Sequence, residues 1–292
     1  MASKVEFSHL DKVFFPQKGY TKGDLVEYYQ SVAKIMLPYL KDHPCNLLRQ
    51  PSGIDGEGFF QKDMGDKLPK WVTTKAIYSE SNEKNINYFV CKDADHLLYM
   101  VQLGSIEINP WNSRIQNLDK PDWIVIDLDP DDNPFSQVIE TAKVVKSICD
   151  EFAIPCYPKT SGKTGMHIFI PMGAKYSYDQ AKTFAQIIAN MVDIRTGDFT
   201  SVVRDPQKRK GKIYVDFLQN RAGQTLAAPY SVRPTPEATV STPLHWDEVN
   251  SKLKPTNFTI KNMARRLDKV GDLWKPVIGK PIDLKKILSK ME

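Results

Sequence analysis

The sequence lacks any long hydrophobic run, which excludes one large class of proteins. No stretch of the 292 residues approaches the roughly 20 consecutive apolar residues that a membrane-spanning helix needs. The opening residues, MASKVEFSHL, also lack the apolar core of a secretory signal peptide. These two absences predict a protein that acts in the cytoplasm.

Cysteine is scarce as well. The sequence contains no CxxC pair, and no histidine stands at a zinc-knuckle spacing from a cysteine. We therefore expect reduced core or surface thiols rather than a disulfide framework or a structural zinc site. The four cysteines are Cys45, Cys91, Cys149 and Cys156.

Neither basic nor acidic residues are in strong excess. Forty basic residues against 35 acidic residues give a net charge of +5, which permits an anionic partner without identifying one. Hydrophobic residues make up 41% and charged residues 26%, which is typical of a globular protein. Because there is also no internal repeat and no low-complexity linker, disorder and repeat architectures are excluded.

Hydrophobic periodicity predicts alternating strands and helices. One expected helix has a capping-box-like start at Thr21 and Asp24. Strand–helix–strand order with a hairpin predicts an α/β architecture with a mixed sheet. We expect helices at residues 21–40, 135–152 and 178–194, strands at 123–128, 154–159, 166–170 and 213–218, and surface loops at 204–212 and 229–243.

Two carboxylates stand at the end of one expected strand. Asp127 and Asp129 are two residues apart, and side chains alternate along a strand, so both point to the same face. Two carboxylates placed in this way can share divalent ions, and strand ends are where open α/β sheets place ligands. The alternative is a solvated acidic turn, DLDPDD, that precedes the next helix.

A third carboxylate lies within another expected strand. Asp216 has apolar neighbours in IYVDFL, and a half-buried aspartate is costly unless it is paired or bound to a metal ion. Three acids on two strands form an oxygen-rich site that suits magnesium or manganese. Two ions about 3.5–4 Å apart in such a site can support an in-line phosphoryl displacement. The alternative is a polar residue on an edge strand.

The turn between two of the strands has the composition of an anion site. Gly162 and Gly165 allow backbone N–H groups to converge, while Ser161, Lys163 and Thr164 add hydroxyl and ammonium donors. His167 begins the next strand, within reach of a phosphate oxygen. The spacing is not that of a Walker A loop, and a tight hairpin with an exposed histidine is the alternative.

Three segments, in order, resemble the motifs of archaeo-eukaryotic primases. They are VIDLDP, TSGKTGMHIFIP and VDFLQN. The polymerase domain of the ligase D proteins of prokaryotic non-homologous end joining is the most similar. Supporting segments are LDKVFFP, TKGDLVEYY, RQPSGIDGEGFFQKDM, INPWNSR and APYSVRPTPEATVSTPLHWDEV.

The resemblance implies a primase-polymerase fold, with mixed central β-sheets flanked by helices, over the whole chain. It implies a single catalytic domain at residues 1–292. Within this domain we expect an N-terminal DNA-end-binding part at about 1–115, a metal- and nucleotide-binding part at about 116–245, and a helical tail at about 246–292.

The resemblance also implies an activity. The site adds nucleoside triphosphates to a primer 3′-hydroxyl, with a preference for ribonucleotides, and uses two Mn²⁺ or Mg²⁺ ions held by Asp127, Asp129 and Asp216. Relatives often carry a basic residue at the position of Thr164, whereas this chain has Lys163 one place earlier. The implied nucleotide-binding residues are Ser161, Lys163, Thr164, Gly165, His167, Gln219 and Arg233.

Relatives also hold the DNA beyond the primer. By resemblance, Lys12 and Lys22 bind the 5′-phosphate of the downstream strand, with assistance from Arg49. Phe59 and Phe60 match an aromatic pair that stacks on template bases, which tolerates any sequence. The alternatives are ordinary surface charge for the basic residues and core packing for the phenylalanines.

The chain departs from its relatives at two positions. Asn109 stands where many relatives have histidine, and it can donate a hydrogen bond but cannot titrate near neutral pH. His9 stands where asparagine is common near the 5′-phosphate site. The basic loop RDPQKRKGK is expected to help arrange the active site through Arg204, Arg209 or a neighbour such as Lys210.

Several functions remain open on these residues. A gap-filling end-joining polymerase is favoured over a primase that starts chains de novo, a non-catalytic DNA-end bridging module and a two-metal nuclease. The chain contains no Lys-x-Asp-Gly, the nucleophile motif of ATP-dependent ligases. The family therefore implies a separate ligase and a Ku-like end-binding protein as partners, with the protein associated with the nucleoid when bound to DNA.

Overall fold

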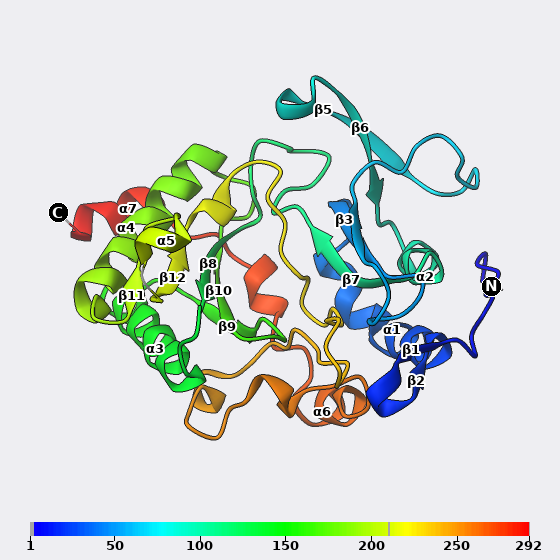
Figure 1. Ribbon diagram of the computed structural model, residues 1–292. Helices are drawn as coiled ribbons and strands as arrows, with labels where there is room; N and C mark the ends of the chain where they lie inside the picture. The colour runs from blue at the N-terminus through cyan, green and yellow to red at the C-terminus, as the bar shows by residue number, and fades with distance from the viewer. Residues whose placement is uncertain (1–2, 210, 292) are drawn as a thin grey trace. The chain divides into compact units, whose positions relative to one another are not determined.

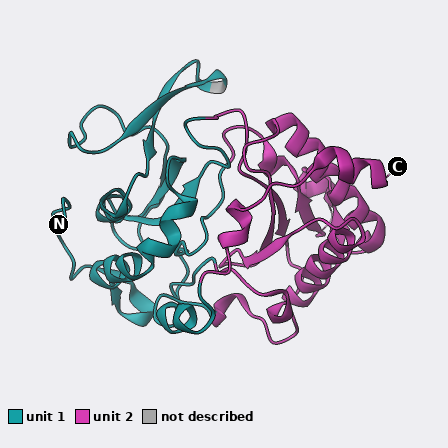
Figure 2. Ribbon diagram, turned by 180° about the vertical axis from the view of Figure 1, so that it is seen from behind, with its two compact units in different colours: residues 1–116, 225–241, 258–271 teal, residues 117–224, 242–257, 272–292 magenta. Residues whose placement is uncertain are grey.

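The computed structural model describes residues 3–209 and 211–291, which form two compact units. Unit 1 comprises residues 1–116, 225–241 and 258–271, and unit 2 comprises residues 117–224, 242–257 and 272–292 (Figure 2). The expected tail, 246–292, is therefore divided between the units. Within the described residues, no helix is long and apolar enough to cross a membrane.

Unit 1 is built on an antiparallel sheet in which β3 is the central strand (Figure 1). The strand order is β4-β3-β6-β5, and β7 also pairs with β3. The strands are β1 (Val13–Phe15), β2 (Tyr20–Thr21), β3 (Pro44–Arg49), β4 (Phe59–Gln61), β5 (Thr74–Ser79), β6 (Lys84–Val90) and β7 (Ser105–Pro110). The helices are η1 (Pro16–Lys18), α1 (Lys22–Met36), η2 (Leu37–Tyr39), η3 (Glu80–Asn82), α2 (Ala94–Gln102) and α6 (Met263–Val270).

Helix α1 begins where its sequence predicts. The Thr21 side chain accepts a hydrogen bond from the Asp24 backbone N–H, and the Asp24 side chain accepts one from the Thr21 backbone N–H. This reciprocal capping box satisfies two N–H groups that the first turn leaves without a partner. Leu25, Tyr29 and Met36 along the same helix are fully buried, so the helix packs by its apolar face.

Unit 2 is built on a second sheet, with the strand order β11-β12-β8-β10-β9 (Figure 1). Strand β11 runs parallel to β12, and the other neighbours are antiparallel. The strands are β8 (Trp123–Asp129), β9 (Tyr157–Thr160), β10 (Met166–Pro171), β11 (Thr200–Ser201) and β12 (Ile213–Asp216). The helices are α3 (Phe135–Glu151), α4 (Tyr178–Thr196), α5 (Pro206–Arg209), η4 (Leu218–Asn220), η5 (Trp246–Glu248), η6 (Pro255–Asn257), η7 (Lys275–Ile278) and α7 (Leu284–Met291).

Strand β8 is the centre of this sheet. Its apolar run from Trp123 to Leu128 is buried, and helices α3 and α4 both pack against it. A strand covered on both sides reads as a continuous hydrophobic run, which explains why the sequence predicts it well. The expected α/β class with a mixed sheet is confirmed.

Some expected boundaries are wrong. Strand β9 starts three residues later than expected, at Tyr157, which is the first residue paired with β10. Strand β12 ends at Asp216 and continues into η4 rather than reaching Leu218. Part of the expected 204–212 loop forms the short helix α5, and Lys210 lies outside the described residues.

The segment 229–243 is not a surface loop. Val232, Ala238 and Val240 are fully buried, although proline and polar residues surround them. Val232 pairs with Val240, and Thr239 pairs with Thr259, so backbone hydrogen bonds replace water for this part of the chain. Local composition alone does not reveal these pairings.

All four cysteines are free and buried. Burial raises the pKa of the Cys45 thiol to about 12, which keeps it protonated and unreactive.

Candidate active site

Asp127 and Asp216 are directly opposite each other on neighbouring strands. Strands β8 and β12 are antiparallel, and their register pairs Asp127 with Asp216 and Asp129 with Tyr214. Residues directly opposite in an antiparallel pair project from the same face, and so do residues two apart on one strand. The three predicted aspartates therefore lie on one face of the unit 2 sheet.

Two further residues extend this pairing into a row across four strands. On β10, His167 is opposite Asp127, and on β9, Lys159 is opposite His167. The Lys159 Nζ lies 2.8 Å from His167 Nδ1, and His167 Nε2 lies 3.4 Å from Asp127 Oδ1. Lys159 is completely buried, and His167 is 3% exposed. His167 is thus part of the carboxylate site rather than an exposed residue of a hairpin.

Desolvation raises the pKa of two of the carboxyl groups. Burial raises the pKa of Asp216, partly offset by hydrogen bonds from the Leu218 backbone and other groups. Desolvation also raises the pKa of Asp129, and Arg209 partly offsets it. Raised carboxyl pKa values indicate too little positive charge around the group, which a bound cation would correct.

The basic segment before β12 reaches this site. The Arg209 guanidinium lies 4.6 Å from the centre of the Tyr214 ring, and it acts electrostatically on Asp129. Burial and the neighbouring Asp216 raise the pKa of Tyr214, while Arg209 and Arg204 oppose that rise. Arg209 is therefore within electrostatic range of Asp129, and Arg204 is within electrostatic range of the neighbouring Tyr214.

A side-chain amide holds the end of β12 against β8. Asn220 Oδ1 accepts a hydrogen bond from the Val125 N–H at 2.8 Å, and Asn220 Nδ2 donates to the Val125 carbonyl at 2.7 Å. The amide thus replaces a backbone partner where β12 has ended. The Asp216 carboxylate accepts hydrogen bonds from the backbone N–H groups of Leu218 and Gln219. This turn places Gln219, a predicted nucleotide-binding residue, beside Asp216.

The turn between β9 and β10 is closed by Ser161. Its Oγ accepts hydrogen bonds from the backbone N–H groups of Lys163 at 3.1 Å and Gly165 at 3.0 Å. Gly162 has φ 78°, and a Cβ on Gly165 would lie 2.2 Å from the Leu128 carbonyl oxygen. Glycine is therefore required at 165 for close contact with β8. Lys163 and Thr164 are exposed at the tip of the turn.

The donor set on this face fits a hard divalent cation. It consists of carboxylate oxygens, which are the ligands that magnesium and manganese prefer. Desolvation raises the pKa of two of the carboxyl groups, those of Asp129 and Asp216. In the described part of the chain, however, no three His, Cys, Asp or Glu side chains converge as ready-made ligands of one ion. Closing around a metal ion would require movement of these side chains.

In unit 1, a cavity of about 360 Å³ gathers three predicted basic residues. The Lys22 Nζ donates hydrogen bonds to the Ser8 carbonyl and to the carbonyl and side-chain oxygens of Gln102, and burial followed by the nearby Lys12 lowers its pKa. The cavity is lined by Ser8, His9, Lys12, Phe14, Lys22, Arg49, Pro51, Gln102, Leu103 and Gly104, and none of these is acidic. The lining fits an anion.

Arg49 links this cavity to the exposed aromatic pair. It donates hydrogen bonds to the Leu103 carbonyl and to Gln61 Oε1, and its guanidinium lies 5.3 Å from the centre of the Phe59 ring. Phe59 and Phe60 are 46% and 59% exposed. Core packing, the alternative for these phenylalanines, is therefore excluded within unit 1.

Arg233 and Asn109 also lie in unit 1. The Arg233 Nε lies 2.8 Å from Glu107 Oε2, in a largely buried ion pair. Asn109 is opposite Asn46 in the β3–β7 pairing, and both are buried. Among the described residues, Asn109 Nδ2 and Asn46 Oδ1 have no hydrogen-bond partner. Buried unsatisfied amide atoms are rare and are often explained by a bound ligand.

Comparison with known proteins identifies the family. The family model of the LigD primase-polymerase domain matches residues 21–274. The chain belongs to the LigD primase-polymerase family. Domains of this family are DNA-directed nucleotidyltransferases, and the resemblance inferred from the motifs is confirmed.

Individual relatives agree. The chain is 34% identical over 270 residues to a bifunctional non-homologous end joining protein LigD of Bacillus subtilis, covering 92% of this chain and 43% of that protein. It is 33% identical to a multifunctional LigD of Pseudomonas aeruginosa, covering 94% of this chain and 33% of that protein. The chain thus spans between a third and a half of the length of these relatives.

A solved structure supports the same fold. The polymerase domain of Mycobacterium tuberculosis Ligase D, in complex with DNA, matches with a TM-score of 0.87 and 25% identity, covering 96% of this chain and all of that domain. The primase-polymerase fold expected from the motifs is confirmed.

Sequence reasoning assigned no role to two residues of the site. The sequence indicates Lys159 only as the start of the turn, because its place opposite His167 depends on the register between β9 and β10. Asn220 closes the VDFLQN motif, but its partner Val125 is 95 residues away. No local pattern reveals such a contact.

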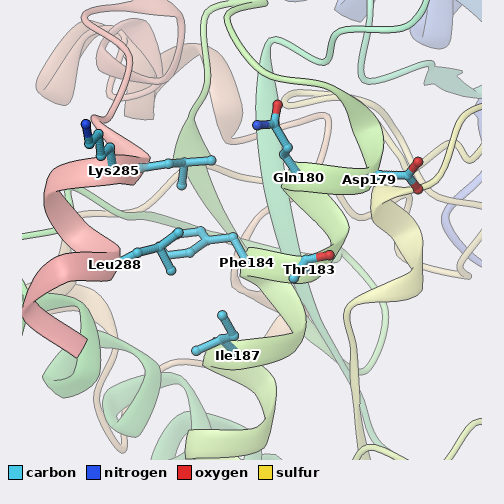
Figure 3. A pocket seen from close by; sticks show the side chains of 8 residues that line it. Asp179, Gln180, Thr183, Phe184, Ile187, Lys285 and Leu288 are labelled. Carbon is cyan, nitrogen blue, oxygen red and sulfur yellow. The ribbon is translucent and has the colours of Figure 1, made fainter. Parts of the chain in front are cut away.

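Unit 2 also contains a cavity that is lined by none of the predicted site residues. Helices α4 and α7 border a cavity of about 470 Å³ that includes Phe184 and Leu288 (Figure 3). Its lining is mainly apolar, and we assign it no role in the reaction.

Proposed function

We propose that the protein fills gaps and extends 3′ ends at DNA double-strand breaks during non-homologous end joining, by template-directed nucleotidyl transfer. The observation that carries this proposal is the opposed pair Asp127 and Asp216, with His167 beside it, in a LigD-family domain. The three aspartates hold two divalent ions, Mn²⁺ or Mg²⁺. The chemistry these ions supply is a lowered pKa of the primer 3′-hydroxyl and neutralisation of the triphosphate.

The residues of unit 2 orient the nucleotide. The turn closed by Ser161 presents the exposed Lys163 and Thr164 side chains to the triphosphate, and the close approach at Gly165 keeps this turn against β8. His167 donates a hydrogen bond towards the triphosphate, and Gln219 contacts the nucleotide beside Asp216. Arg204 and Arg209 add positive charge that favours the negatively charged transition state.

The residues of unit 1 hold the DNA and contribute to nucleotide binding. Lys12, Lys22 and Arg49 bind the 5′-phosphate of the downstream strand in the cavity without acidic lining. Phe59 and Phe60 stack on unpaired template bases, because their rings are exposed. Arg233 supplies a fixed positive charge for the phosphates of the incoming nucleotide. The proposal also includes selectivity for ribonucleotides. Its partners are a Ku-like end-binding protein and a separate ligase, and its location is cytoplasmic, associated with the nucleoid.

A comparison of DNA substrates tests the function. Purified protein is incubated with Mn²⁺ or Mg²⁺ and ribo- or deoxyribonucleotides on a gapped duplex with a downstream 5′-phosphate, the same duplex without the phosphate, and a primer-free template. The proposal predicts extension that is strongest on the phosphorylated gap and with ribonucleotides.

The other outcomes identify the alternatives. Products on the primer-free template would indicate a primase that starts chains de novo. Tight binding to the phosphorylated end with no extension on any substrate would indicate a non-catalytic bridging module. Shortening of the labelled primer without nucleotides would indicate a nuclease.

A further inference from the structure

Lys159 is an unusual residue to find inside a sheet. It is completely buried on β9, and its Nζ lies 2.8 Å from His167 Nδ1 and 5.7 Å from the centre of the Phe169 ring. Burying an ammonium group is costly unless a specific partner compensates for it. An apolar residue would pack in this core without that cost, so packing alone does not account for a lysine here.

The partners on either side of His167 determine which ring nitrogen carries the proton. On one side, Nε2 faces the Asp127 carboxylate at 3.4 Å, and a carboxylate only accepts hydrogen bonds. On the other side, the ammonium of Lys159 only donates, so Nδ1 accepts. If the shared proton moves from Nζ to Nδ1, Nε2 still carries its hydrogen. In either state Nε2–H faces the carboxylates.

We propose that Lys159 is a positioning residue that acts through His167: it holds the imidazole as a fixed Nε2–H donor facing the Asp127–Asp216 row. The four side chains lie on one row across β9, β10, β8 and β12. An imidazole held in this way donates to a phosphate oxygen or a carboxylate and does not offer Nε2 as a lone-pair ligand to a metal ion. Outer partners of this kind commonly determine the orientation of a site histidine.

The expected effect of Lys159 on catalysis rests on the proposed function, whereas its effect on the His167 imidazole does not. In the metal-free protein the proposal makes a separate prediction about the tautomer of His167. Two-bond ¹⁵N–¹H spectra of histidine-labelled protein distinguish a protonated Nε2 from a protonated Nδ1, and His167→Gln assigns the signal among the five histidines. We expect protonated Nε2 in the wild type and a mixture of tautomers in Lys159→Met.

A double-mutant cycle tests the catalytic part. Lys159→Met should lower kcat/KM for nucleotide addition by roughly ten- to a hundred-fold, the usual range for such partners. In a His167→Ala background the same change should lower it by less than about twofold, because Lys159 acts through the imidazole. Lys143→Met, at an exposed lysine of α3, is the matched control and should leave kcat/KM unchanged.

The outcomes separate this proposal from the proposed function. Protonated Nδ1 with a bare Nε2 at His167 of the wild type would overturn the positioning role, whatever the Lys159→Met variant does. Equal losses from Lys159→Met in both backgrounds would overturn it too and would indicate a purely structural lysine. A protonated Nε2 in a wild type that extends no primer would leave the positioning of His167 intact and contradict the polymerase function.

Discussion

Asp127 and Asp216 are a cross-strand pair, held in register by the antiparallel pairing of β8 and β12. The two residues are 89 positions apart in the sequence, and the sheet brings them to one face together with Asp129 and His167. Paired like charges in a partly desolvated site are unfavourable without a cation. The paired charges therefore lower the stability of the metal-free protein, although the same carboxylates are needed for the reaction.

The first prediction concerns the stability that the charge on Asp216 removes from the metal-free protein. Asp216→Asn removes a charge whose desolvation is unfavourable, while the amide oxygen can still accept from the Leu218 N–H, which lies 2.6 Å from Asp216 Oδ1. The variant should raise the free energy of unfolding of the metal-free protein at neutral pH, measured by urea denaturation. The same variant should reduce primer extension by roughly a hundred-fold or more, because several kcal/mol of transition-state stabilisation are lost. Lower stability together with lost activity would contradict this account.

The second prediction concerns pH. The folded protein binds protons at Asp129 and Asp216 more tightly than the unfolded chain does, because desolvation raises both pKa values above the ordinary 3.8. The contribution of these groups to stability therefore falls as pH rises from 3.8 through the raised pKa values. Mn²⁺ competes with these protons, so its affinity should decline on acidification at a higher pH than for an exposed carboxylate pair. Isothermal titration with Mn²⁺ across this range is the measurement, and a pH-independent affinity would contradict it.

The third prediction concerns the exposed aromatic pair. Phe60→Ala should weaken binding to gapped DNA by roughly five- to a hundred-fold, since stacking contributes about 1–3 kcal/mol per base. The melting temperature should barely change, because the Phe60 side chain is 59% exposed. Ile194→Ala, at an 84% exposed position on α4, is the control and should affect neither quantity. Fluorescence anisotropy with a labelled duplex measures the affinity, and an unchanged affinity for Phe60→Ala would exclude stacking.

The fourth prediction concerns the cavity of unit 1. Lys12→Ala should reduce the preference for a 5′-phosphorylated gap over an unphosphorylated one, and should make the slope of log affinity against log salt less steep by about 0.7–0.9. Lys18→Ala, at an exposed lysine that does not line the cavity, should retain the preference. A preference that survives Lys12→Ala in full would place the phosphate site elsewhere.

The fifth prediction concerns Asn220. Asn220→Ala removes both hydrogen bonds to Val125 and leaves buried backbone groups without partners, which should cost about 1–3 kcal/mol in the free energy of unfolding. Because the turn also carries Gln219 beside Asp216, the KM for nucleotide should rise. Urea denaturation and steady-state kinetics measure the two effects. A variant with normal stability would show that the amide does not hold the end of β12.

The sequence predicted those features that depend on local pattern. The apolar run of β8, the periodicity of α3 and α4 and the capping box of α1 are each encoded within a few residues. Local pattern does not predict contacts between segments that are far apart in the sequence. The burial of 229–243 depends on pairing with Thr259, and the amide contact of Asn220 depends on Val125.

The same contrast holds for the site. The spacing of Asp127 and Asp129 predicted one face, the half-buried strand added Asp216, and the composition of the turn added His167. The register that aligns Lys159, His167, Asp127 and Asp216 depends on hydrogen bonding between four strands. Side-chain alternation places a residue on a face but does not determine which residue of the next strand is opposite it. The role of Lys159 therefore emerged only from the structure.

Incorporation of a labelled nucleotide at a phosphorylated gap, in the presence of Mn²⁺, tests the central claim most directly. Wild type, Asp127→Asn and Asp216→Asn are compared with Asp131→Asn, which changes an exposed aspartate just beyond β8. The account predicts incorporation by the wild type and by Asp131→Asn, and loss of incorporation in the other two variants although both remain folded. Incorporation that persists in Asp127→Asn and Asp216→Asn would contradict it.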